Sequence, residues 1–443
     1  MTDLALAPTA ALSERRRRHR TIAVGAGLYA LSGPGQTAGF SVFVDPVTEA
    51  FGTSRSGLTA AYLVATLAAA PTGIWIGRHI DHRPTSFMIR AVSTGLAAAL
   101  LISAAAPTIA VLVLGVFGLR AFGQSGLTLT SSTFVARAIH ERRGAALGAL
   151  SAFGGFAIAL TPLVASRLIP HIGWRGTWAL LAVTVATVGW AISRTRSANE
   201  AAPVDVSGDR ATAPRRPAKL THEQRWAFLV VAAGFGATSA ISTSLAFHQI
   251  AVLGERGLSS TEAATNFLPQ SLAAVTTAIV VGRLVDRLPG RIVVPINMVM
   301  LTLAMLSLRL VGSAPTAIVF GLALGIAVAA NGASEGGLLA RWLGSETLGS
   351  IRGRLMAVVV TASAIGPLAF TLLADATGSF TLAATIATII PISVIALTLT
   401  APLPADRNQL SLSSTRPTRT VGQSCRGVPC TSNTTGPAPS QSR

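Results

Sequence analysis

Charged residues are scarce in this chain of 443 residues: they make up 12% of it, whereas half of the residues are hydrophobic. A soluble globular protein carries about 25% charged residues. The apolar residues gather in runs of roughly 20 or more, the length that crosses a hydrocarbon core of about 30 Å as a helix. The composition therefore argues against an ordinary soluble domain and predicts an all-α membrane protein.

Cysteine and lysine are nearly absent. The only cysteines, Cys425 and Cys430, lie in a polar tail without zinc-site partners, so we expect neither a disulfide framework nor a zinc finger. The only lysine, Lys219, lies outside the Gly-Lys-Ser/Thr context that a phosphate-binding P-loop needs, which excludes a P-loop ATPase. The sequence also lacks a His-Glu-x-x-His motif and a paired-aspartate metal motif. We therefore expect no enzyme, no metal and no cofactor.

The apolar runs predict twelve transmembrane helices in two pseudo-symmetric bundles of six. The N-terminal bundle, 21–193, is expected to hold helices at 21–45, 55–78, 86–106, 108–135, 145–168 and 176–193. The C-terminal bundle, 223–400, is expected to hold helices at 225–252, 260–282, 292–312, 315–340, 354–374 and 380–400. The remaining segments are predicted to be a cytoplasmic tail at 1–20, a flexible cytoplasmic linker at 194–222 and a disordered cytoplasmic tail at 401–443.

The net charge of +18 is unevenly divided between the connections. If both termini and the even-numbered connections share one side of the membrane, that side holds 29 of the 35 Lys and Arg residues. Loops rich in Lys and Arg remain in the cytoplasm. We therefore expect a multi-pass protein of the cell membrane with both termini in the cytoplasm, and this pattern explains the charge without a nucleic-acid partner.

A short charged signal occurs twice. Gly77-Arg78-His79-Ile80-Asp81 follows the second predicted helix, and Gly282-Arg283-Leu284-Val285-Asp286 follows the eighth, 205 residues later. The same shift aligns Gly52 with Gly257 and Ser54 with Ser259. Matching signals after matching helices indicate an internal duplication.

Each copy resembles the signature loop of the major facilitator superfamily, Gly-x3-Asp-(Arg/Lys)-x-Gly. His82 and Pro84 depart from that pattern in the first copy. The resemblance covers about 21–400 and implies the major facilitator fold, with the two loops as conformational gates. We expect a tight turn at the glycine, with the aspartate near a helix N-terminus, where an anion is favoured. Alternatively, the arginines only anchor the loops in the cytoplasm. The gating residues so identified are Gly77, Arg78, Asp81, Arg83, Gly282, Arg283, Asp286 and Arg287.

Further segments fit the same family. Arg120-Ala121-Phe122-Gly123-Gln124-Ser125-Gly126 resembles the arginine motif of its fourth helix. Ile365-Gly366-Pro367, followed by Asp375-Ala376-Thr377-Gly378-Ser379, resembles the eleventh helix of bacterial members related to monocarboxylate and oxalate/formate carriers. Those carriers use membrane-embedded Lys or Arg in the first, eighth or eleventh helix. Here the only lysine is Lys219 and the eighth helix has no Arg before Arg283, which argues against monocarboxylate specificity and leaves Arg120 as the main anion anchor.

Ionisable and polar residues within the spans are the candidates for substrate binding or proton coupling. A central arginine such as Arg120 costs about 2.5–3.5 kcal/mol on insertion scales, which makes it a functional hypothesis; the alternative is a structural arginine bonded to carbonyls. Glu335 is a candidate proton carrier, or else lines the cytoplasmic vestibule. Each of the remaining candidates can instead form an interhelical hydrogen bond. They are Gln124, His248, Gln249, Gln270 and Asn331.

These features predict a secondary active transporter that moves a small organic solute, such as an organic anion, by alternating access coupled to protons. Its partners would be the small-molecule substrate, the proton and the lipid bilayer, and we expect a monomer. The alternative within this fold is an efflux pump for drugs or metabolites, which an aromatic content of 5% and the central Arg120 disfavour. A membrane-embedded enzyme and a non-transporting sensor rank lower.

Overall fold

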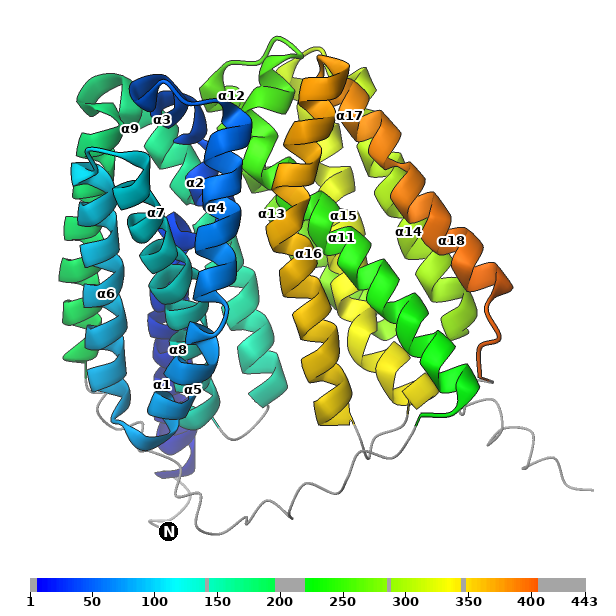
Figure 1. Cartoon of the computed structure of the whole chain (residues 1–443). Helices are drawn as coiled ribbons and strands as arrows, with labels where there is room; N and C mark the ends of the chain where they lie inside the picture. The colour runs from blue at the N-terminus through cyan, green and yellow to red at the C-terminus, as the bar shows by residue number, and fades with distance from the viewer. Residues whose placement is uncertain (1–5, 140–142, 196–219, 285–287, 344–347, 405–443) are drawn as a thin grey trace, which may run out of the picture.

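The computed structural model describes residues 6–139, 143–195, 220–284, 288–343 and 348–404. Within these ranges every regular element is a helix, and no strand is formed. The helices form two bundles that stand side by side, one from each half of the chain (Figure 1). Most of the predicted linker and of the C-terminal tail lies outside the described residues.

The N-terminal bundle contains elements that are partly interrupted within single membrane passes. They are α1 (Leu6–Ala30), η1 (Gly33–Gly35), α2 (Thr37–Ser41), α3 (Val44–Phe51), α4 (Arg55–Ala69), α5 (Thr72–His82), α6 (Thr85–Ala105), α7 (Ile109–Gly118), the π-helix η2 (Leu119–Leu127), α8 (Thr128–Ala138) and α9 (Arg143–Ser193).

The C-terminal bundle follows the same order of passes with longer continuous helices. Its elements are α11 (His222–Gly254), α12 (Ser260–Thr265), α13 (Phe267–Leu284), α14 (Gly290–Ser307), η5 (Leu308–Leu310), α15 (Ala314–Leu343), α16 (Leu348–Thr377), α17 (Phe380–Ala387) and α18 (Ile389–Thr400).

The chain makes twelve passes. Nine helical stretches among the described residues are long and apolar enough to cross a membrane. One of them, the 48 residues Ala146–Ser193, would measure about 72 Å as a straight helix, more than twice a bilayer core, and the kink at Gly173 divides it into two passes. Two further passes are α1 to α3, broken by Gly33–Gly35, and α12 with α13, broken at Asn266. The predicted number of helices is therefore confirmed.

The duplication is visible in the backbone. The four described glycines with positive φ form two pairs, each separated by 205 residues: Gly52 (57°) with Gly257 (86°), and Gly173 (69°) with Gly378 (71°). This left-handed conformation is readily adopted by glycine because it has no Cβ. Ser54 and Ser259, also 205 residues apart, are the N-caps of α4 and α12. The hydroxyl of each accepts a hydrogen bond from a backbone N–H. The two bundles thus repeat their turns as well as their helices.

The first pass crosses the fourth at very short range. Gly33-Pro34-Gly35 interrupts the predicted helix 21–45, since proline lacks an N–H, and the resulting turn packs on η2. A Cβ added to Gly35 would lie 2.7 Å from the Cα of Gly123, and one added to Gly123 would lie 2.7 Å from the Cα of Gly35. Only glycine at both positions permits this backbone contact, because a Cβ at either one would clash with the other backbone. Small residues of this kind let membrane helices approach closely.

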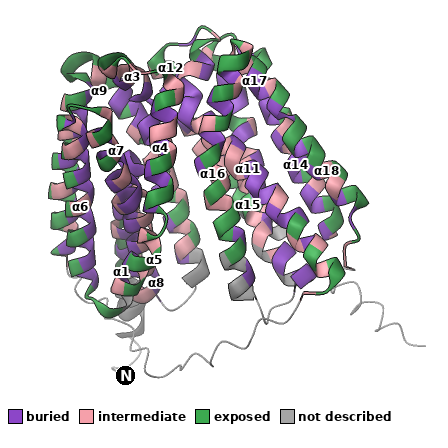
Figure 2. Cartoon of the chain, in the orientation of Figure 1, coloured by how far each residue is buried: buried purple, intermediate pink, exposed green. Residues whose placement is uncertain are grey.

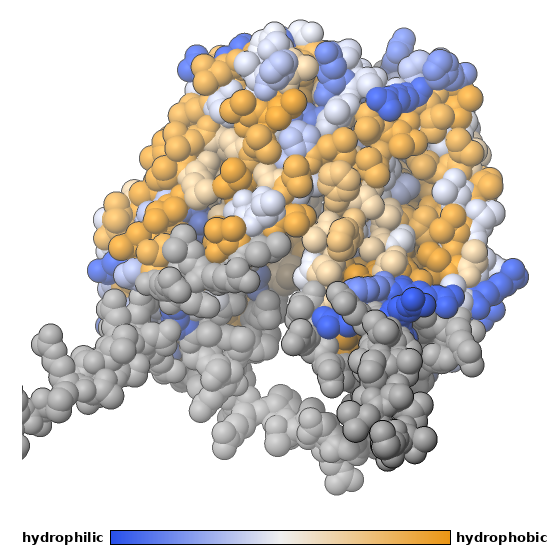
Figure 3. All heavy atoms as spheres, turned by 180° about the vertical axis from the view of Figure 1, so that it is seen from behind, coloured by the Kyte–Doolittle hydropathy of each residue, from blue (hydrophilic) through white to orange (hydrophobic). Residues whose placement is uncertain are grey.

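The flanks of both bundles are apolar. Exposed large hydrophobic side chains are spread over most of the passes, and polar residues gather toward the two ends of the molecule (Figures 2 and 3). Buried residues lie between the helices of each bundle (Figure 2). An apolar belt with polar ends is the surface that a bilayer requires.

The Gly35–Gly123 crossing can be tested by adding a side chain. Gly123→Val should lower the midpoint of thermal unfolding in detergent, because overpacking of a tight contact costs about 1–3 kcal/mol. Gly148→Val is the matched control, since a Cβ at Gly148 on α9 would meet nothing within 4 Å. Equal midpoints for the two variants would show that the crossing tolerates a side chain and would contradict the packing described above.

Candidate functional site

The two bundles meet at one end of the molecule. We call this the closed end; it carries the turns at Gly52, Gly173, Gly257 and Gly378, and lies at the top of Figure 1. The opposite end, which carries the N-terminal segment, is called the basic end (Figure 1). Contacts between the bundles pair α2 with α11, α4 with α16, and α9 with α12 and α13. Toward the basic end the ribbons of the two bundles diverge (Figure 1).

Three aromatic rings close the space between the bundles. Phe40 on α2 and Tyr62 on α4 belong to the N-terminal bundle, and Phe247 on α11 belongs to the C-terminal one. The Phe247 ring centroid lies 4.7 Å from that of Tyr62, edge-on, and 5.7 Å from that of Phe40. All three side chains are buried. Aromatic pairs of this geometry contribute about 0.5–1.5 kcal/mol beyond the area they bury.

A polar contact beside these rings also joins the bundles. The hydroxyl of Thr59 on α4 lies 3.3 Å from that of Thr371 on α16. Thr371 lies 2.9 Å from Nε2 of His248 on α11, and its hydroxyl donates to the carbonyl of Pro367. We define these residues and the three rings as the closed-end gate: Phe40, Thr59, Tyr62, Phe247, His248 and Thr371.

An ion pair covers the gate from outside. Arg55, at the start of α4, pairs with Asp45 on α3, and its guanidinium lies 5.5 Å from the ring centroid of Phe380 on α17. The cation–π contact therefore links the N-terminal bundle to the C-terminal one.

Arg120 is buried inside the N-terminal bundle. It lies on the π-helix η2, and its Nη1 donates to the carbonyl of Gly35 at 3.2 Å and to the hydroxyl of Thr37 at 3.3 Å. The guanidinium lies 5.2 Å from the ring centroid of Tyr62, whose hydroxyl is 3.0 Å from that of Thr37. Arg120 thus binds a carbonyl of the broken first pass and the π-face of the gate residue Tyr62.

The other edge of the Arg120 guanidinium is open. Its Nε is buried without a hydrogen-bond partner, and Nη2 makes no hydrogen bond. One turn later, the side-chain amide oxygen Oε1 of Gln124 is also buried and unpartnered. The salt bridge of the closed end joins Arg55 to Asp45, and none of the described carboxylates forms a salt bridge with Arg120. A buried cation without a counter-charge is costly unless a ligand compensates it.

Two of the predicted candidates bind each other. Nε2 of Gln249 on α11 donates to the carbonyl of Ala263, and its oxygen accepts from Gln270 on α13 at 2.7 Å. Both bonds join the seventh pass to the eighth. Gln249 and Gln270 therefore hold these passes together within one bundle.

Asn331 and Glu335 lie one turn apart on α15. Asn331 is buried, and its carbonyl accepts from Ser334, which also accepts from Asn297 on α14. Glu335 is half-buried. Since these residues lie on a different bundle from Arg120, the candidates divide between the two halves.

The first repeated loop and the described residues that flank the second lie at the basic end. Gly77 and Arg78 are part of α5, so the predicted tight turn at Gly77 is wrong. The helix continues to His82 because the first breaker is Pro84, and Arg83 before it is extended (φ −117°, ψ 152°), as a residue preceding proline prefers to be. Gly282 is part of α13, whereas the side chains of Asp81 and Arg283, and all of Asp286 and Arg287, lie outside the described residues.

Arginines from the fourth and tenth passes brace these loops in the same way in both halves. Arg137 on α8 donates to the carbonyl of Ile80, and Arg341 on α15 donates to the carbonyl of Leu288. The carbonyl of Ile80 lies in the last turn of α5, where a helix leaves such groups unpaired, and that of Leu288 lies in the connection just before α14.

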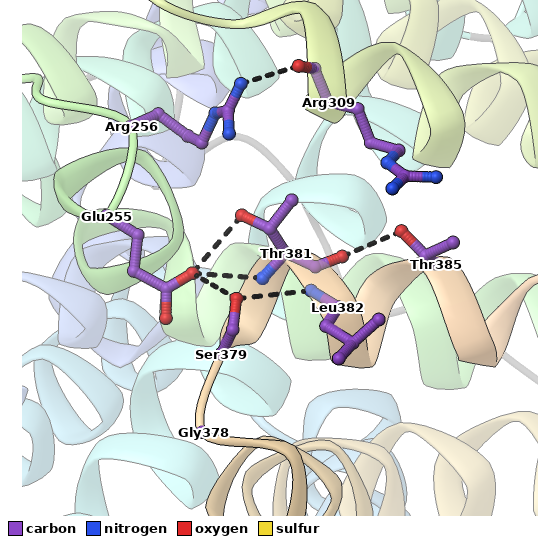
Figure 4. Close-up of a pocket in the computed structure, with 8 residues that line it drawn as sticks. All are labelled: Glu255, Arg256, Arg309, Gly378, Ser379, Thr381, Leu382 and Thr385. Atoms are coloured by element: carbon purple, nitrogen blue, oxygen red, sulfur yellow. Dashed lines mark hydrogen bonds between the residues drawn. The ribbon is translucent and has the colours of Figure 1, made fainter.

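A cavity of about 620 Å³ opens at the closed end of the C-terminal bundle (Figure 4). On one side of it the carboxylate of Glu255 accepts the backbone N–H groups of Phe380 and Thr381 at the start of α17. On the other side Arg256 donates to the carbonyls of Arg309 and Val311. The charged side chains that line this cavity, Glu255 and Arg256, thus join the end of α11 to the start of α17 and to the residues around η5. No group of three His, Cys, Asp or Glu side chains suited to a metal occurs in the described part of the chain.

Sequence reasoning missed six residues that shape these contacts: Thr37, Phe40, Thr59, Tyr62, Phe247 and Thr371. Tyr62 is one of only two tyrosines, which is a weak signal. The threonines and the two phenylalanines carry none, because such residues fill most of the spans and nothing in the sequence shows which of them face the other bundle.

The comparisons with known proteins agree with this architecture. The family model for the Major Facilitator Superfamily matches residues 27–265 and 247–430. No curated protein matches the chain. Among solved structures, it is similar to a bacterial homologue of the human lysosomal transporter Spinster in an inward-facing, unoccupied conformation, with a TM-score of 0.66 and 16% identity over 87% of this chain and 97% of that one.

The same homologue in an inward-facing, occupied conformation gives a TM-score of 0.63 and 15% identity, over 87% of this chain and 95% of that one. At this identity the likeness concerns the fold. The family model, in contrast, covers most of the chain through both halves. The chain therefore belongs to the major facilitator superfamily of membrane transporters.

Proposed function

We propose that this protein is a secondary active transporter of a small organic anion, coupled to protons, in the cell membrane. Alternating access needs two bundles that close on a ligand from one side while they open to the other. The aromatic and threonine contacts of the closed-end gate, together with the divergence of the bundles toward the basic end, fit one half of such a cycle (Figure 1).

The orientation follows from charge. The basic end carries the N-terminal arginines, the first repeated loop, the described residues that flank the second, and the last described residues of α18 and 401–404. By the positive-inside rule this end faces the cytoplasm, so the closed end faces away from it. The described arrangement then corresponds to an inward-facing state, and the solved homologue of Spinster that it resembles is also inward-facing.

The observation that carries the substrate class is the open edge of Arg120. The Nε and Nη2 edge of a guanidinium pairs with a carboxylate through two parallel hydrogen bonds. Here Nε is buried without a partner, Nη2 makes no hydrogen bond, and none of the described carboxylates pairs with the guanidinium. A small carboxylate would supply both the acceptor atoms and the charge, whereas an apolar drug would leave the cation uncompensated. The polar Gln124, one turn away, is the second candidate contact, and Asn331 and Glu335 contribute from the other bundle.

The repeated loops are proposed to gate the basic end. Because Arg137 and Arg341 tie each loop to the pass behind it, each loop moves with its own bundle. Contacts between the two loops would then form when the basic end closes. The residues assigned to them are Gly77, Arg78, Asp81 and Arg83, and Gly282, Arg283, Asp286 and Arg287.

Removal of the Arg120 charge should abolish transport without loss of the protein. Arg120→Ala is expected to lower uptake or export in proteoliposomes to the background, because the anion loses its bidentate partner, while membrane insertion and yield stay close to wild type. Arg90→Ala is the control, since Arg90 is exposed on α6. Transport of wild-type rate by Arg120→Ala would contradict the anchor role.

Ligand screening can identify the anion. Small carboxylates, sugars and drugs are added to the purified protein at two pH values, and thermal unfolding is measured. A carboxylate substrate at about 100 times its Kd should stabilise the folded state by about 2.7 kcal/mol, because it binds only that state. The same compound should have no effect on Arg120→Ala. Stabilisation by neutral drugs alone would favour the efflux alternative instead.

The gating role can be separated from binding by changing Asp81. Asp81→Asn should slow substrate exchange across the membrane several-fold while the Kd for substrate stays within about twofold of the wild type, because a gate controls the rate of interconversion rather than the site. Exchange and Kd are measured on the same proteoliposomes. Lost binding with an unchanged exchange rate would overturn the assignment.

A further inference from the structure

We propose that His248 is the proton-binding residue of the closed-end gate: it stays neutral while the gate is closed and takes up a proton when the gate opens. A low pH on the side that the closed end faces would then favour the open gate, and this would couple transport to protons. This inference rests on the proposed alternating-access transport and assigns its proton site to one residue.

The first step is the position of His248. Its side chain is completely buried on α11 and is part of the contact that joins the bundles. Nε2 lies 3.1 Å from the carbonyl oxygen of Pro367 and 2.9 Å from the hydroxyl of Thr371, which in turn meets Thr59 of the other bundle. The surroundings of the imidazole therefore depend on whether the gate is closed.

The second step is the other ring nitrogen. Nδ1 is buried and has no hydrogen-bond partner. The rings of Phe247, Phe370 and Phe380 surround the imidazole, with centroids at 4.8, 5.8 and 5.1 Å. In the protonated ring both nitrogens carry N–H donors. Nε2–H would have the Pro367 carbonyl, but Nδ1–H would have no acceptor, and a buried unpaired charged donor is strongly unfavourable.

The third step is the set of charges around the ring. From α4, Arg55 lies over the Phe380 ring that also contacts His248, so a second cation would be placed nearby. Arg55 is itself paired with Asp45. On α16 the next ionisable residue is Asp375, one turn beyond Thr371 and exposed. At the end of α11, Glu255 is held by the backbone of α17. Among these described residues no carboxylate pairs with His248.

The fourth step is what opening changes. Arg55, Thr59, Phe40 and Tyr62 all belong to the N-terminal bundle, so its separation from the C-terminal bundle removes them from the ring together. Phe247, Phe370 and Phe380 stay with His248 in the C-terminal bundle, but the Arg55 cation leaves with the other bundle. Water can also reach the side of the imidazole that the N-terminal bundle covered, and both changes lower the cost of the charged ring. A proton that binds one of two states shifts the equilibrium toward that state. For a single proton this shift is at most tenfold per pH unit.

The test measures gate opening directly, without substrate. Spin labels are placed on Glu49→Cys of α3 and Leu310→Cys of η5, both exposed at the closed end, in the full chain with Cys425 and Cys430 replaced by serine. Double electron–electron resonance in lipid nanodiscs from pH 8 to pH 5 gives the ratio of long to short distances. In the wild type this ratio should rise as the pH falls, by up to tenfold per unit.

His248→Gln keeps a polar side chain that cannot titrate, and its distance ratio should not change with pH. His222→Gln, at an exposed histidine of the basic end, is the matched control and should respond like the wild type. A wild-type ratio that is independent of pH, or a pH response that survives in His248→Gln, would overturn the assignment.

A second measurement needs no variant. Hydrogen–deuterium exchange at the C2 position of each imidazole, followed by mass spectrometry, reports the titration of His248 in the wild-type protein. Its midpoint should coincide with the midpoint of gate opening; a His248 that does not titrate in that range would also overturn the assignment. If the gate responds to pH through His248 but proteoliposomes transport no solute, the proposed transport fails instead, so the two failures are distinguishable.

Discussion

The crossing of the first pass with the fourth is the contact on which the N-terminal bundle depends. Gly35 and Gly123 bring two backbones together at a point where the first pass has tightened to a 3-10 turn and the fourth has widened to a π-helix. Such irregular backbone inside a membrane is tolerated where it is buried in protein. Here it has a further consequence, because the carbonyl of Gly35 becomes free to bind Arg120. The break, the wide turn and the buried cation are therefore one arrangement.

The two bundles share a backbone plan and differ in chemistry. Under the 205-residue shift the turn glycines and N-caps coincide, but Arg120 aligns with Gly325 and His248 aligns with Phe43. The N-terminal bundle holds the buried cation that we assign to the substrate, and the C-terminal bundle holds the imidazole that we assign to the proton. Duplication thus explains the shared backbone, while the functional proposal depends on Arg120 and His248, each of which is present in only one of the two copies.

Tyr62 connects the two proposals. Its hydroxyl is 3.0 Å from Thr37 and its ring faces Arg120, while the same ring packs edge-on against Phe247 across the gate. The environment of the Arg120 cation and the closed-end gate therefore share one side chain. Any movement that separates the bundles at the closed end changes the contacts of Tyr62, so the gate and the anion site are physically continuous.

The twelve passes, the duplication and the family were predictable from the sequence, because apolar length and charge distribution are local properties that the bilayer itself imposes. The repeat of Gly52 and Ser54 at Gly257 and Ser259 was also visible there and proved to be structural. The predicted tight turn at Gly77 was wrong, since the helix continues through it to His82 and the break comes only at Pro84. Only the tertiary structure decided that Gln249 pairs with Gln270, that Arg120 keeps one open edge, and that Thr59 meets Thr371. These contacts join residues from different passes, and their partners depend on how the helices rotate against one another, which composition and spacing do not encode.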